Sequence, residues 1–270
     1  MDKKILLTMM AAVLFSAPSF AGAVSAPQYW EKMERKVREC AVEKQQAKNF
    51  VKVLRPLLDS YYAASACVTY TPAFTFPVEG YNSESIGGRK GSGYISNKFD
   101  FYQADKPGGH PAHDIFIKDI NRDCMDDITR KPVKVLSASV GVVVSVSTGW
   151  AKGDILKGGN YVWVYDPELK ALFYYAHLGT VAVKTGAIVE PGMEIGTVGR
   201  TGLNAGKRKS PTHLHFMFVT YPKDGTIKPR NIYANLVSGV MPGKHAETAS
   251  DEKKQSVLHK EDGRLYSGRK

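Results

Sequence analysis

The sequence predicts a mainly β protein with a helical segment near its N-terminus. Residues 68–238 are rich in Val, Tyr, Phe, Thr and Gly, and Pro-Gly and Gly-Gly turns separate their short apolar runs, which is typical of strands. Residues 27–66 instead carry apolar side chains every three or four positions, which is the period of a helix. About 170 residues of strand-like sequence are enough to bury one hydrophobic core.

We expect four parts along the chain. Residues 1–23 have the basic start, short apolar middle and small-residue cleavage sites of a secretory signal peptide. Residues 24–67 form the N-terminal helical segment, and residues 68–238 form the main domain. Residues 239–270 are polar and are expected to be a flexible tail. The apolar stretch in 1–23 is too short to span a bilayer, so we expect an exported, periplasmic or extracellular protein without a membrane span.

The helical segment has a heptad-like apolar seam. Its positions are Trp30, Met33, Val37, Cys40, Lys44, Ala47, Val51 and Leu54. Pro56 is expected to end or kink the helix, with a second short helix after it. Three interpretations stay open: the seam forms a coiled-coil dimer, it packs against the chain's own main domain, or it covers a groove and restrains activity.

Ligand-type side chains gather in three short motifs. Five of the seven histidines lie beside apolar, strand-like runs, in His110-Pro-Ala-His113-Asp114, at His177 and in His213-Leu-His215. Because side chains two apart on a strand share a face, the last two histidines project together. Imidazole and carboxylate are the usual ligands of a catalytic zinc, which takes three from the protein and leaves one position open. A zinc site is therefore one hypothesis from spacing alone.

The order of these motifs resembles a known family. His-x-x-x-Asp, then Tyr-Ala-His-Leu, then His-Leu-His-Phe, with glycine-punctuated hairpins in residues 183–202, resembles the lysostaphin-type (LytM-like) zinc metalloendopeptidases that cut peptidoglycan cross-bridges. The resemblance covers roughly residues 74–236 and implies an antiparallel β-sheet with an open cleft. It places early strands at residues 141–144 and 159–164.

The resemblance also implies a role for each site residue. His110, Asp114 and His215 would bind Zn²⁺, and His177 and His213 would be catalytic histidines that do not bind it. Zinc lowers the pKa of its bound water to about 7, and this water would attack amide bonds in peptidoglycan peptide cross-links. One histidine would orient or deprotonate the water, and the other would stabilise the oxyanion and donate a proton.

Two features depart from the family pattern. The family usually has Gly-x-Asp where this chain has Ala112-His113-Asp114. We interpret His113 as a residue of the opposite strand face with a local hydrogen bond, and the alternative is that it replaces His110 as a ligand. The acidic insert, residues 118–127, contains the Asp-x-Asn-x-Asp spacing that opens calcium loops but lacks the later elements of such loops. We interpret it as a solvated loop near the cleft.

The composition narrows the classes of molecule that the protein is expected to bind. The formal net charge is +11, yet no nucleic-acid recognition motif is present, so we expect no nucleic acid and favour an anionic wall polymer, peptidoglycan, as the partner. Simple solubility is the other explanation of the charge. Of the three cysteines, Cys40 and Cys67 are the favoured disulfide pair, which leaves Cys124.

The sequence therefore predicts a secreted zinc endopeptidase of peptidoglycan. The alternative is a catalytically inactive or masked LytM-like protein that binds murein or activates another wall hydrolase. A third hypothesis is a zinc peptidase that acts on protein substrates.

Overall fold

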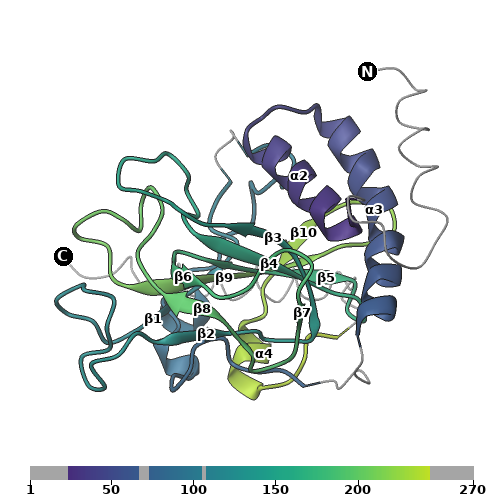
Figure 1. Cartoon of the computed structure of the whole chain (residues 1–270). Coiled ribbons are helices and arrows are strands. Elements are labelled where there is room, and N and C mark those ends of the chain that lie inside the picture. The colour runs from purple at the N-terminus through teal and green to yellow at the C-terminus, as the bar shows by residue number, and fades with distance from the viewer. Residues whose placement is uncertain (1–23, 67–72, 105–107, 244–270) are drawn as a thin grey trace, which may run out of the picture.

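The computed structural model describes residues 24–66, 73–104 and 108–243. These residues form an antiparallel seven-stranded sheet in the order β1-β9-β5-β4-β3-β7, with β10 also paired to β9 (Figure 1). A smaller antiparallel sheet has the order β2-β8-β6. The strands are β1 (His113–Phe116), β2 (Lys134–Leu136), β3 (Gly141–Ser147), β4 (Tyr161–Asp166), β5 (Ala171–Ala176), β6 (Leu178–Val181), β7 (Ile188–Val189), β8 (Glu194–Val198), β9 (His213–Thr220) and β10 (Lys228–Arg230).

The large sheet is covered on both faces. Alternate side chains of β4 point to opposite sides, as the pleat requires. Val162 and Val164 pack in a cluster with residues of the small sheet and of α4 (Tyr233–Ser238). Trp163 packs in a second cluster with α2 (Ala26–Arg38) and α3 (Lys44–Ser65). The predicted class, mainly β with an antiparallel sheet and an N-terminal helical segment, is confirmed.

The helical segment packs against the chain's own sheet. Trp30 of α2 is 1% exposed, and its ring centroid lies 5.8 Å from that of Trp163. Val37, Val51 and Leu54 are also buried in this layer. The apolar seam therefore packs against the chain's own main domain, which is one of the three interpretations given above. The coiled-coil dimer stays a prediction.

Two expectations about the helices are wrong. The seam does not run through one helix, because α2 ends at Arg38 and Cys40 adopts a φ of +54° before α3 begins. Pro56 does not end a helix but lies inside α3, so no separate second helix follows it, and the expected kink stays a prediction. A proline in a helix loses one hydrogen bond to the carbonyl four residues earlier, and burial of Leu54 and Leu58 on either side of it holds the helix together.

Several expectations concern residues outside the described part of the chain. These are the signal peptide of residues 1–23, Cys67 and hence its pairing with Cys40, and nearly all of the tail, from residue 244 on. Within the described residues, no helix has the length and apolar character needed to cross a membrane.

Candidate functional site

The pairing of β1 with β9 brings the predicted motifs together. Asp114 lies opposite His215, and Phe116 lies opposite His213. Because residues two apart on β9 share a face, both histidines project from the same side as Asp114. His110 comes from the segment just before β1, where its backbone pairs with Ile95.

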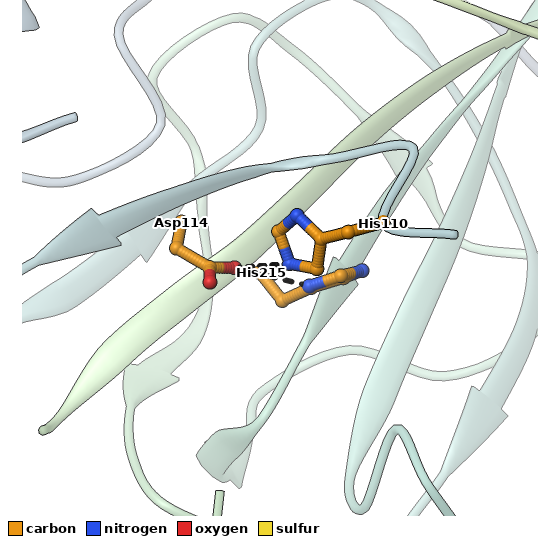
Figure 2. Close-up of side chains that lie close together, drawn as sticks. All are labelled: His110, Asp114 and His215. Carbon is orange, nitrogen blue, oxygen red and sulfur yellow. Dashed lines mark hydrogen bonds and ion pairs between the residues drawn. The ribbon is translucent and has the colours of Figure 1, made fainter. Parts of the chain in front are cut away.

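His110, Asp114 and His215 converge on one point (Figure 2). One ligand atom from each lies within 4.8 Å of the others. His110 Nε2 is 3.2 Å and His215 Nδ1 is 3.1 Å from the same oxygen, Asp114 Oδ1. In the described part of the chain, this is the one group of three or more ligand-type side chains with the spacing of a metal site. Two imidazoles and one carboxylate match the donor set of a catalytic zinc.

A backbone carbonyl orients the first of these ligands. His110 Nδ1 lies 3.0 Å from the carbonyl oxygen of Gly93. With Nδ1–H donated there, Nε2 is the ring nitrogen that faces Asp114, and a cation could take the place of the proton that these two atoms share in the metal-free protein. The sequence analysis did not predict this contact, because it joins residues from two loops.

His177 and His213 lie beside the three ligand-type residues. The ring centroid of His177 is 4.9 Å from that of His213 and 5.4 Å from that of His215. Each of the two residues places Nδ1 2.8 Å from a backbone carbonyl oxygen, that of Thr201 for His177 and that of Pro211 for His213. Donation from Nδ1 leaves a lone pair on Nε2 of each ring, which is the form that accepts a proton.

The charges of the cluster are strongly coupled. Burial raises the pKa of Asp114, but hydrogen bonds from His110 and His215 outweigh it and hold that pKa well below its usual range. The hydrogen bond to Asp114 raises the pKa of His110. Burial, followed by the neighbouring His215 and His213, lowers the pKa of His177 to about 3, so this ring is neutral near pH 7. Burial also lowers the pKa of His215.

His177 lies in a tight turn. This residue has a φ of +64°, which is uncommon for a side chain other than glycine. Gly202 faces it with a φ of +109°, and a Cβ at that position would lie 2.9 Å from His177 Nδ1 and 2.4 Å from the carbonyl oxygen of Lys157. Only glycine fits this turn without displacing the histidine or its loop.

The five predicted site residues line one cleft of about 980 Å³. Its walls come from four places: the end of α2, the segment before β1, the loop between β3 and β4, and the loop before β9. The α2 residues in the wall are Glu34, Val37 and Arg38, and Glu39 and Cys40 follow directly after the helix. Sequence reasoning left open that the helical segment reaches the groove, but it did not identify these residues.

His113 lies on the other face of β1. It is 2% exposed, its Nε2 is 3.1 Å from Asn231 Oδ1, and its ring stacks on Tyr94 at a centroid distance of 5.6 Å. Burial lowers its pKa to about 4. This placement agrees with the interpretation of a local hydrogen bond and separates His113 from the metal-ligand candidates.

Two carboxylates of the acidic insert accept hydrogen bonds from protein groups. Asp119 accepts hydrogen bonds from the amides of Asp123 and Cys124, at 3.1 and 2.9 Å, and from the hydroxyl of Thr212 at 2.5 Å. Asp126 accepts from two amides and from Tyr81 Oη. The expectation of a solvated loop is wrong for these two residues, which are 7% and 5% exposed, because Asp119 contacts Thr212 and Asp126 contacts Tyr81, both outside the insert.

Comparison with known proteins gives one family match. Residues 125–229 match the model of Peptidase family M23. The matched range contains His177, His213 and His215 and begins after His110 and Asp114. The resemblance predicted from the motifs is confirmed by this match. None of the curated proteins compared with the chain matches it.

The chain is also similar to several solved structures. A putative glycyl-glycine endopeptidase lytM from Ruminococcus gnavus ATCC 29149 shares 20% identity over 80% of this chain and 96% of its own, with a TM-score of 0.42. The catalytic domain of lysostaphin from Staphylococcus simulans shares 24% identity over 48% and 80%, with a TM-score of 0.34. A zinc-containing peptidase from Vibrio cholerae shares 21% identity over 58% of this chain and only 38% of its own, with a TM-score of 0.36. Likenesses at this level carry no conclusion about activity.

Proposed function

We propose that this protein is an exported zinc-dependent endopeptidase that hydrolyses amide bonds in peptidoglycan peptides. The observation that carries the proposal is the convergence of His110, Asp114 and His215 beside two further histidines in one cleft. The match to Peptidase family M23 supports the reaction class. Export rests on the signal-like residues 1–23, and the division into residues 24–67, 68–238 and 239–270 stays a prediction.

The residues that would hold zinc are His110 through Nε2, His215 through Nδ1 and Asp114 through its carboxylate. Their ligand atoms are close enough to share one cation, and the low pKa of Asp114 keeps its charge available. When bound in such a site, zinc supplies a water molecule that ionises near neutral pH and polarises a carbonyl group.

His177 and His213 would move the protons. Their Nδ1 contacts to backbone carbonyls fix each ring and leave Nε2 as the proton-accepting atom. One ring can take the proton of the attacking water, and the protonated ring can then donate it to the nitrogen of the leaving amine. Once its Nε2 carries a proton, the other ring, directed into the same cleft, can donate a hydrogen bond to the oxyanion that forms on the scissile carbonyl.

Digestion of purified peptidoglycan tests the proposal. The full chain, its His215→Ala variant and a chelator-treated sample would be incubated with walls of several cross-link types, and the products identified by mass spectrometry. New peptide ends from the untreated wild type alone are expected. No new ends from any wall type, with zinc bound, would contradict the proposal and favour a protein substrate or the murein-binding alternative.

A further inference from the structure

The last turns of α2 form part of the cleft that holds the five site residues. Glu34 and Arg38 line this cleft together with His110, His177 and His215. The helix lies outside the segment that matches Peptidase family M23. If α2 influences which substrates the cleft accepts, that influence therefore comes from a part of the chain outside the matched segment.

Glu34 is a buried anchor for the arginine beside it. It is 8% exposed and accepts hydrogen bonds from Tyr161 Oη at 2.8 Å and from Ser145 Oγ at 3.2 Å. Its other carboxylate oxygen lies 3.5 Å from Arg38 Nε. This ion pair orients the guanidinium through charge, and Arg38 Nε itself is buried without a hydrogen bond.

Arg38 is held on two sides and remains partly open. Its Cζ atom stands 5.9 Å from the centroid of the Tyr161 ring, and its Nε side faces Glu34. The side chain is still 29% exposed, and the residue lines the cleft. A guanidinium has five N–H donors in a rigid fork that matches a carboxylate, so a fixed and partly exposed arginine is suited to bind one.

Two of the three carboxylates in the cleft wall near Arg38 already have partners. Asp100 is paired with Lys44 at 2.5 Å, and Glu34 accepts hydrogen bonds from its hydroxyl donors. Glu39, the residue after Arg38, is exposed and is the carboxylate with which a bound anion would compete for the arginine. Aromatic rings connect Arg38 to the histidines, since Tyr161 and Tyr174 are 5.3 Å apart and Tyr174 and His215 are 6.2 Å apart. These centroid distances set an upper limit on the separation of Arg38 from His215, and at ~3.3 Å per extended residue that limit is about five residues of a bound peptide.

We propose that Arg38, anchored by Glu34, is a specificity-determining residue that binds a free carboxylate of the substrate peptide a few residues from the bond that is cut. The inference rests on the proposed peptidase function. It predicts that the chain prefers peptides whose carboxylates are free over the same peptides with a carboxamide at that position.

Paired peptides test this inference. Synthetic cross-linked peptides, each with one carboxylate amidated in turn, would be assayed for kcat/KM with the wild type, Arg38→Gln and Arg38→Lys. Arg35→Gln is the matched control, because it removes an exposed cation of the same helix that is not in the cleft wall. Thermal melts and zinc content would show whether each variant is folded and loaded.

The expected result is that amidation at one position lowers kcat/KM by about 10-fold or more in the wild type and in Arg35→Gln. In Arg38→Gln the same amidation should lower kcat/KM by less than about 2-fold, and the effect in Arg38→Lys should lie between those of Arg38→Gln and the wild type. A wild type that is indifferent to every amidation, or a penalty that survives in folded Arg38→Gln, would overturn the inference while leaving the peptidase function standing.

Calorimetric binding separates the two proposals. The same peptides would be titrated into zinc-loaded His213→Ala protein with and without the Arg38→Gln change. If these peptides show an Arg38-dependent preference for the free carboxylate while the wild-type protein digests no wall, the carboxylate site stands and the proposed function is rejected. Equal binding of free and amidated peptides would reject the carboxylate site.

Discussion

The site cluster (His110, Asp114 and His215) and the acidic insert (residues 118–127) use carboxylates in opposite ways. In the site cluster, one carboxylate oxygen contacts two imidazoles whose lone pairs converge on the same point. In the insert, Asp119 and Asp126 accept hydrogen bonds from amides and hydroxyls of nearby chain. Both regions carry ligand-type residues at short spacing in the sequence, but only the first offers its ligand atoms to a cation.

The two regions differ in the donors that their carboxylates contact. The partners of Asp114 are imidazole nitrogens, which can exchange a proton for a cation, whereas Asp119 and Asp126 contact amides and hydroxyls, which cannot. A carboxylate that already accepts two or three hydrogen bonds from amides has its charge compensated and its geometry fixed. An imidazole that donates one nitrogen to a carbonyl keeps the other nitrogen free. The predictions below test this contrast, from the largest expected effect to the smallest.

The largest effect is expected for His215→Ala. Removing one of three protein ligands should weaken zinc binding by more than about 100-fold, since loss of even an outer-shell partner costs 10–100-fold. Release of peptides from the wall should stop with it. Zinc content by elemental analysis and peptide release by mass spectrometry measure the two effects, and Asp119→Asn in the insert is the control that should keep its zinc. A fully loaded His215→Ala protein would break the comparison.

His177→Ala and His213→Ala should each separate metal binding from turnover. Neither ring belongs to the converging triad, so zinc content should be unchanged, while kcat should fall by about 10²–10⁴-fold as a proton-transfer group is lost. Steady-state kinetics on a defined cross-linked peptide, with parallel zinc analysis, tests this. Loss of zinc from either variant would show that the substituted histidine is a zinc ligand.

Zinc affinity should fall as the pH is lowered. In the metal-free protein the hydrogen bond to Asp114 raises the pKa of His110 above its usual value near 6.5, so a proton competes with the metal at and below that pH. Below the raised pKa, affinity should drop by about 10-fold per pH unit for this one competing proton. Competition titrations with a chromophoric chelator between pH 5.5 and 8 measure the slope. A flat profile would show that His110 is not a ligand.

Asp119→Ala should affect stability rather than zinc. The change leaves two backbone amides and the Thr212 hydroxyl without their buried acceptor, at a cost of about 1–3 kcal/mol. Denaturant unfolding of the chelator-treated protein measures this, and Asp123→Asn, at an exposed position, is the matched control with a smaller expected loss. An undiminished free energy of unfolding would mean that the insert is not held by these contacts.

The smallest effect is expected for added calcium. Because Asp119 and Asp126 are already engaged by protein donors, millimolar calcium should shift the melting temperature by less than about 1 °C. Differential scanning calorimetry with calcium, and with magnesium as the control, tests this. A shift of several degrees specific to calcium, lost in Asp123→Asn, would make the insert a cation site after all.

The sequence was most informative where the strand period decides the answer. The alternation of His213 and His215 on β9 predicted a shared face, and the order of the motifs predicted their proximity to Asp114. Long-range contacts were not predictable in this way. The carbonyls of Gly93 and Thr201 orient histidines from distant loops, and no local pattern marks such an acceptor.

The errors have equally local causes. Val37 of α2 and Ala47 of α3 are buried in the same cluster against the sheet. The apolar pattern of the sequence therefore continues across the break between the two helices, although the helix itself does not. Closely spaced aspartates are needed both in a loop that binds calcium and in a loop whose carboxylates accept hydrogen bonds from backbone amides. Only the positions of the amides, fixed by folding, distinguish them.

The central claim is best tested by a crystal structure of the zinc-loaded protein with anomalous diffraction data collected at the zinc absorption edge. The account predicts one dominant peak, about 2.0–2.2 Å from a ring nitrogen of His110, a ring nitrogen of His215 and a carboxylate oxygen of Asp114. A dominant peak at His113 or within the acidic insert would contradict it.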